Sequence, residues 1–174
     1  MQTAIAATVA AGSACTGTSG SPWRFFSADE GKTLEALCDR IIPPDQDPGA
    51  AWAGVVNYID RQLCGSLKRY RKVYRDGIAG VDESSHQLYG KSFSALDSQA
   101  QIELMHRLED GRAPGEIWNR TSSSDFFSLL VEQTREGFYG DPRHGGNRDA
   151  TSWKMLGLPY PPIRGRLRYD LTKL

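Results

Sequence analysis

The chain has 174 residues, and its 21 lysines and arginines balance its 21 aspartates and glutamates, so its formal net charge is zero. This length suffices for one domain with a sizeable apolar core. A neutral chain has no general positive field for nucleic acid, and no stretch reaches the ~18 uncharged apolar residues that a membrane span needs. These numbers favour a soluble globular domain and leave its function open.

The first 23 residues carry no charged side chain. Their apolar run at 5–11, followed by small residues, is similar to the second half of a secretory signal, but no positive residue precedes Arg24. Two explanations stay open: an export signal that begins upstream or belongs to a partner, or a leader without a fold. We divide the chain into a leader (1–23), a helical domain (24–159) and a basic extended tail (160–174).

Apolar residues recur at helical spacing through the middle of the chain, and no segment alternates with the period of a strand. The fold class predicted is all-α, an irregular bundle with an ordered Gly-rich loop and a Pro-rich tail. Five main helices are expected, over residues 27–42, 52–63, 67–88, 97–108 and 122–139.

Turn and capping residues set the ends of these helices. Ser27 and Glu30 have the spacing of a capping box, and Pro43 stops the first helix. Gly140 is expected to end the fifth helix with a positive φ. The core is expected on the apolar faces: Leu34, Leu37, Cys38, Ile41, Trp52, Val55, Val56, Ile59, Leu63, Leu67, Tyr70, Tyr74, Ile78, Val81, Leu88, Ile102, Leu104, Met105, Leu108, Phe126, Phe127, Leu130, Thr134 and Phe138.

The third helix has a row of basic side chains opposite its apolar face: Lys68, Arg69, Arg71, Lys72 and Arg75. Such a row can contact phosphates, or it can be a solvated helix face. Because the whole chain has no net positive charge, we favour the solvated face. A basic-helix nucleic-acid binder is kept as the alternative.

The cysteines and histidines show no pattern of a metal or catalytic site. Cys38 and Cys64 are expected on apolar helix faces, either as buried free thiols or, in an oxidising compartment, as a disulfide. His86, His106 and His144 do not lie within one helical turn of each other in the sequence, and no nucleophile or zinc motif occurs. We therefore assign no catalytic, metal-binding or cofactor-binding residue and expect no activity from the chain alone.

The most informative segment runs from residue 137 to residue 159 as GFYGDPRHGGNRDATSWKMLGLP. Its glycines, including Gly145 and Gly146, permit turns with positive φ. Short polar side chains such as Asn147 can bind neighbouring backbone N–H groups. Trp153 is expected to begin a short helix. This composition predicts a loop that holds one conformation or fits a partner's surface.

Two carboxylates in this segment have an arginine close in sequence. Asp141 lies two residues before Arg143, and Asp149 follows Arg148 directly. Structural pairing explains them better than acid–base chemistry, since an arginine fork matches a carboxylate. His144 has two interpretations, a hydrogen-bonded loop residue or a residue of a partner interface.

This segment resembles the signature of the gluconate 2-dehydrogenase subunit 3 family, the small or gamma subunit of flavin-dependent sugar and polyol dehydrogenases. The likeness extends through a series of short matches in the same order: 25–27, 34–37, 39–43, 53–55, 58–60, 90–93 and 126–127. Residues 112–123 and the tail after Pro159 match no part of the signature.

The resemblance implies an all-α subunit without its own cofactor, bound to a large catalytic flavoprotein of the glucose–methanol–choline type. That partner carries FAD and oxidises a sugar, a sugar acid, a polyol or a glycoside (at the ring C3 position), and electrons often pass to a cytochrome c subunit. The small subunit supports folding and periplasmic export of the partner, typically lending it a twin-arginine signal. No twin arginine occurs before residue 24 here.

We expect the interface with the flavoprotein on the glycine-rich segment and the tail. Prolines at 159, 161 and 162 exclude a helix, so the basic tail is either docked on a partner or a mobile terminus. The competing hypothesis is an independent helical enzyme or binding module. The interface residues expected are Phe138, Tyr139, Gly140, Asp141, Pro142, Arg143, His144, Gly145, Gly146, Asn147, Arg148, Trp153, Arg164, Arg166 and Arg168.

Overall fold

A computed structural model describes residues 20–158 of the chain. These residues contain six α-helices and no strand, so the predicted all-α class is confirmed. The leader up to residue 19 and the tail from residue 159 lie outside the described residues. The helices are α1 (Ala28–Ile41), α2 (Val55–Cys64), α3 (Arg71–Tyr89), α4 (Ser98–Glu109), α5 (Ser123–Tyr139) and α6 (Thr151–Met155).

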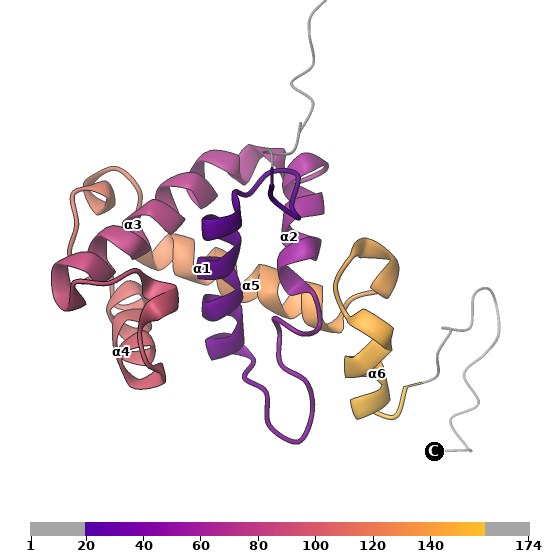
Figure 1. The fold of residues 1–174 in the computed structure, drawn as a ribbon. Helices are drawn as coiled ribbons and strands as arrows, with labels where there is room; N and C mark the ends of the chain where they lie inside the picture. Colours follow the sequence, from indigo (N-terminus) through magenta and orange to yellow (C-terminus); the bar gives the residue numbers. More distant parts are fainter. Residues whose placement is uncertain (1–19, 159–174) are drawn as a thin grey trace, which may run out of the picture.

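α5 is the central helix of the bundle. It packs against α1, α2, α3, α4 and α6. Figure 1 shows α1 and α2 crossing in front of α5, with α3 and α4 at one end of the molecule and α6 at the other. None of the helices in this described part is both long and apolar enough to cross a bilayer.

The segment before α1 is anchored to α2 by one buried carboxylate. Asp60 accepts hydrogen bonds from the backbone N–H groups of Arg24, Phe25 and Phe26 at 3.0, 2.8 and 3.3 Å. Trp23 is also buried and lies against Gly31, where a Cβ would come within 2.0 Å of the indole ring. The folded domain therefore includes Trp23, which the sequence analysis grouped with the leader. The capping box of Ser27 and Glu30 is confirmed.

Aromatic rings fill the core between α1, α3 and α5. The ring of Tyr74 lies 6.0 Å from that of Phe26 and 5.9 Å from that of Phe126, centroid to centroid. Cys38 is a buried free thiol within hydrogen-bond distance of Thr134. Cys64 is disulfide-bonded, so these two cysteines are not linked to each other.

Three predicted core residues are exposed. Trp52 precedes α2, which begins only at Val55 because Gly54 has a left-handed backbone with φ 76°. Leu88 lies in the last turn of α3 and Ile102 on the outer side of α4, and both are more than one-third exposed. α3 itself starts at Arg71, after a separate 3-10 turn over Lys68–Tyr70. A helical pattern alone could not locate these breaks.

Candidate partner-binding site

α5 ends at a glycine that is required for a steric reason. The Gly140 N–H donates to the Glu136 carbonyl at 2.9 Å. Its φ of −71° and ψ of 178° show that the predicted positive φ is wrong. A Cβ at this position would lie 2.5 Å from the Glu136 carbonyl oxygen, which is too close. The chain then leaves the helix in an extended conformation.

Asp141 and Arg143 form the predicted pair on the turn that follows. The Asp141 carboxylate accepts from the Arg143 backbone N–H at 3.0 Å and from its Nε–H at 2.9 Å. These hydrogen bonds stabilise the charged form and hold the pKa of Asp141 well below its usual value. Asp141 therefore stays a carboxylate at physiological pH and caps the 3-10 turn Pro142–His144.

Asn147 joins α5, the loop and α6. Its side chain is fully buried, and its Nδ2 donates to the Gly140 carbonyl at 2.8 Å. Its Oδ1 accepts from the Ser152 N–H, in the first turn of α6, at 3.0 Å. Beside it, Gly146 lies so close to α5 that a Cβ would be 2.1 Å from the Gly137 carbonyl oxygen. Gly146 is thus required by close approach and not by the predicted positive φ, which Gly145 does have.

Three non-glycine residues of this loop have a left-handed backbone: Asn147 (φ 47°), Asp149 (φ 54°) and Ala150 (φ 54°). Asparagine and aspartate adopt this backbone more readily than other residues, and for Ala150 it costs roughly 1–2 kcal/mol relative to an ordinary conformation. Residues of this kind persist where surrounding contacts hold them, and they cluster at functional sites. The helix after them is the short α6, in which Trp153 is the third residue and not the first as predicted. The strain makes 145–150 a candidate functional segment.

A hollow of about 580 Å³ opens beside the loop and is lined by three basic residues. Arg61 comes from α2, Arg148 from the loop and Lys154 from α6. Asp149 is the acidic residue of the lining. Within the residues that the structure describes, none of the three basic side chains forms an ion pair. The predicted pairing of Arg148 with Asp149 is therefore wrong, and the hollow carries an excess of positive charge.

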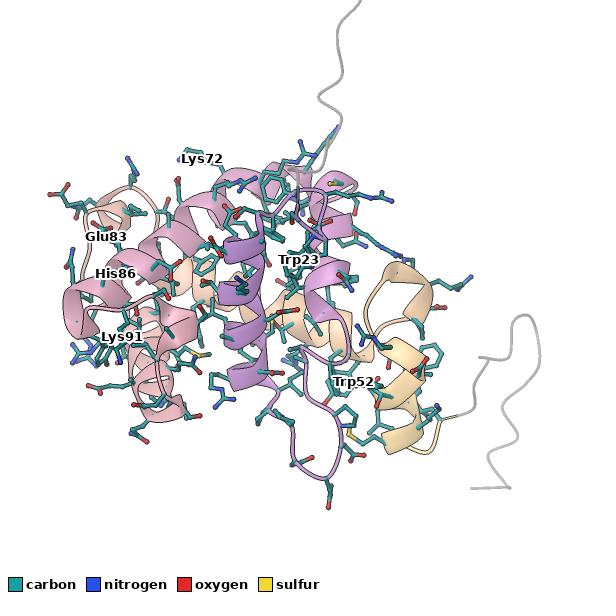
Figure 2. All side chains as sticks on the ribbon, viewed as in Figure 1. Trp23, Trp52, Lys72, Glu83, His86 and Lys91 are labelled. Atoms are coloured by element: carbon teal, nitrogen blue, oxygen red, sulfur yellow. The ribbon has the colours of Figure 1, made fainter. Side chains whose placement is uncertain are left out.

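Arg148 instead binds the turn that precedes α2. Its backbone N–H donates to the Ala53 carbonyl at 3.0 Å, and its guanidinium lies 5.5 Å from the centre of the Trp52 ring. Figure 2 shows Trp52 on the side of the molecule where α6 lies. Two segments far apart in the sequence thus meet at the basic hollow.

Large apolar side chains around α6 are exposed. Trp153 is fixed by its indole N–H, which donates to the Tyr139 carbonyl at 2.8 Å. Seven large hydrophobic side chains are exposed among the described residues. Two of them lie away from α6, namely Leu88 on α3 and Ile102 on α4. The other five lie on the turn before α2, at the end of α5, or on and just after α6: Trp52, Tyr139, Met155, Leu156 and Leu158.

The predicted interface residues separate into four groups. Tyr139, Arg143, His144 and Arg148 are exposed, and Gly140, Asp141, Pro142, Gly145 and Trp153 are half-buried. Phe138, Gly146 and Asn147 are buried and act within the chain, where they shape the loop. Arg164, Arg166 and Arg168 lie outside the described residues.

Several residues of this region are not apparent from the sequence pattern. The pattern predicts a core position for Trp52, which is wrong, and it gives no sign that Arg61, Lys154, Met155 and Leu156 lie near the loop. The Gly54 next to Val55 was the available signal, since a glycine at the start of an apolar run permits a helix to begin there and leaves Trp52 outside it. Nothing in the sequence pattern places Arg61 of α2 beside the loop, because that contact is tertiary.

The basic row is divided between fold and solvent, because Arg71 and Arg75 are half-buried whereas Lys68, Arg69 and Lys72 are exposed. Arg71 donates through Nε to the Leu63 carbonyl at 2.7 Å, and Arg75 pairs with Glu30 and donates to the Phe25 carbonyl. Lys72 pairs with Asp76 on the same helix. The two arginines therefore hold the N-terminal segment and the α2–α3 connection, and the predicted solvated face is confirmed only for Lys68, Arg69 and Lys72.

The histidines do not come together in the folded chain. His86, His106 and His144 are all exposed, and His106 lies 3.6 Å from the carboxylate of Glu109. Within residues 20–158, no group of three or more His, Cys, Asp or Glu side chains could hold a metal ion. The loop of residues 140–154 with its basic hollow remains the candidate site.

The family comparison covers this loop and the bundle that holds it. Residues 28–159 match the family model described as Gluconate 2-dehydrogenase subunit 3, a range that contains all six described α-helices. Comparisons with curated proteins and with solved structures gave no match. The chain belongs to the gluconate 2-dehydrogenase subunit 3 family, a family of small subunits of dehydrogenase complexes.

Proposed function

We propose that the chain is the non-catalytic small subunit of a heteromeric dehydrogenase whose catalytic subunit is an FAD-containing flavoprotein of the glucose–methanol–choline type. Family membership supports the complex. The single structural observation that carries the proposal is the loop of residues 140–154, which is fixed internally while the residues around it expose apolar groups. Exposed apolar groups on a rigid support are typical of a surface that binds another protein.

The proposed role follows from linkage. A subunit that binds the folded flavoprotein and not its unfolded chain shifts that protein toward its native state, by about 2.7 kcal/mol at a concentration of 100 Kd. The substrate would be a sugar, a sugar acid, a polyol or a glycoside, chosen by the pocket of the partner. Further parts of the proposal are electron transfer to a cytochrome c subunit and joint export to the periplasm, for which the uncharged leader is the supporting feature.

The test is a mild affinity purification of the tagged full-length chain from its native host. We expect a large flavoprotein in stoichiometric amount, identified by mass spectrometry, with a flavin absorbance spectrum and FAD released on denaturation. A panel of sugars, polyols and glycosides with an artificial electron acceptor then defines the substrate. An unrelated exported protein with the same tag is the control. A chain that elutes alone, folded and colourless, would contradict the proposal.

A further inference from the structure

We propose that the catalytic subunit docks on a composite face, in which an apolar patch around α6 adjoins the basic hollow, and that its matching surface has acidic side chains beside an apolar area. This inference rests on the proposed function and assigns the face and the chemistry of the partner. The apolar patch consists of Trp52, Met155, Leu156 and Leu158. The basic hollow is lined by Arg61, Arg148 and Lys154.

The apolar patch is held out into solvent by a rigid support. Trp52 is 45% exposed, yet its neighbours Ala50 and Ala53 are fully buried. The turn that contains it is closed by hydrogen bonds from the Ala53 N–H to the Gly49 carbonyl and from the Val55 N–H to the Ala50 carbonyl. A tryptophan on such a turn offers a large contact area at little entropic cost, and tryptophan is enriched among the residues that dominate interface energies.

Arg148 connects the apolar patch to the basic hollow. Its guanidinium lies over the Trp52 ring and also lines the hollow. Two acidic side chains lie near Arg148 and offset part of its charge. Asp149 shares the lining of the hollow. The pKa of Glu35 is raised by burial and by the charge of Asp39, and the positive charge of Arg148 offsets part of this rise. Arg61 and Lys154 add two further positive charges without ion-pair partners among the described residues. The excess positive charge favours an acidic partner surface.

The same positive charges disfavour two other possible ligands of this face, a second copy of the chain and the chain's own tail. A second copy docked face to face would bring like charges together, because a two-fold interface presents the same patch twice. The tail of this chain has four basic residues against Asp170, so it has the same sign as the hollow. A catalytic subunit with carboxylates beside an apolar area fits both parts of the face.

The strained loop explains why the two parts keep a fixed distance from each other. Asn147 ties Arg148 to α5 and α6 through its bonds to Gly140 and Ser152. The Arg148 N–H ties the loop to the Trp52 turn through Ala53. A face held in its bound shape loses less conformational entropy on association.

The first experiment uses the purified complex and a water-soluble carbodiimide, which joins a lysine amine directly to a neighbouring carboxylate. We expect a crosslink from Lys154 to an aspartate or glutamate of the flavoprotein. A Lys154→Arg variant keeps the charge and should lose the crosslink. Lys91 lies at the opposite end of the molecule (Figure 2) and should give no crosslink to the flavoprotein. A crosslink from Lys154 only to a second copy, or to Asp170 of the tail, would overturn the proposal.

The second experiment measures binding of the flavoprotein to variants that keep the wild-type circular dichroism. Trp52→Ala and Lys154→Glu should each weaken binding by roughly tenfold or more. Leu88→Ala and Lys91→Glu are the matched apolar and charge controls and should bind as the wild type does. Wild-type affinity in both test variants would rule out this docking face and leave the proposed function standing. If the wild-type chain captured no flavoprotein, both the docking face and the proposed function would be ruled out.

Discussion

The two ends of α5 are stabilised in different ways. At its N-terminal end Phe126 is fully buried and packs against the rings of Tyr74 and Trp118. At its C-terminal end Phe138 is buried too, but the closest approaches are those of glycines: Gly137 lies against the Tyr58 side chain, and Gly146 lies against the Gly137 backbone. This second end also leaves Tyr139 and its α6 neighbours exposed. The difference teaches that the glycine-rich end preserves a surface and the aromatic end stabilises the fold.

The largest expected effect is a loss of stability at the aromatic end of α5. Phe126→Ala should lower the free energy of unfolding by about 3–5 kcal/mol, because it removes a buried ring and leaves a cavity above Gly77. The Phe126 ring lies directly against Gly77, where a Cβ would come within 2.2 Å of it. Chemical denaturation followed by circular dichroism measures the change.

A matched control is available next in the chain. Phe127→Ala removes the same ring from a half-buried position, so it should cost clearly less stability. The folded fraction of both variants should still bind the flavoprotein. Equal losses of stability for the two variants would show that the full burial of Phe126 is not what makes its ring important for stability.

The glycine-rich end is tested by two substitutions at one position. Asn147→Gly tolerates φ 47° but leaves the Gly140 carbonyl and the Ser152 N–H without their partner, which should cost about 2 kcal/mol. Asn147→Ala adds roughly 1 kcal/mol of backbone strain. Denaturant unfolding gives both values, and amide exchange at Ser152 shows whether the loss is local. If the two variants were equally stable, the left-handed backbone at this position would carry no cost.

Sequence reasoning could predict the aromatic end better than the glycine-rich end. The capping box of Ser27 and the spacing of apolar residues depend on local geometry, and this cap is present. The close contact of Gly146 with Gly137 and the position of Arg61 over Gly145 depend on how α2 and α5 cross, which no local pattern encodes. The family motif predicts a site within residues 137–159, and the fold adds that Trp52 lies against Arg148 of that segment.

A smaller, pH-dependent effect is expected at the junction of α1 and α3. Burial raises the pKa of Glu30, but its bonds with Arg75 and Ser27 outweigh this and lower the pKa below the ordinary value of 4.5. Glu30 therefore adds stability above about pH 4.5, and this contribution disappears as the pH falls through the lowered pKa.

The measurement compares Glu30→Gln with the wild type across pH. Because the pair is partly exposed, the variant should lose only about 0.5–1 kcal/mol at neutral pH. The difference between the two proteins should shrink toward acid pH. A difference that stays constant from pH 7 to pH 3 would mean that the pairing with Arg75 does not contribute. The glycine-rich end should be unaffected, since this pair lies in another part of the molecule.

The smallest effect decides whether the strain in the loop serves binding. Asp149 is exposed, with φ 54°, and lines the basic hollow. Asp149→Gly relieves the backbone but gives the unfolded chain more freedom, so the free energy of unfolding should change by less than about 1 kcal/mol. Asp149→Asn keeps a residue that tolerates this conformation and removes only the charge.

If docking uses an acidic surface and a fixed loop, Asp149→Asn should bind the flavoprotein more tightly than the wild type. Asp149→Gly should gain less, because its loop must be ordered on binding. Weaker binding by Asp149→Asn would instead mean that the partner presents a basic group to this hollow.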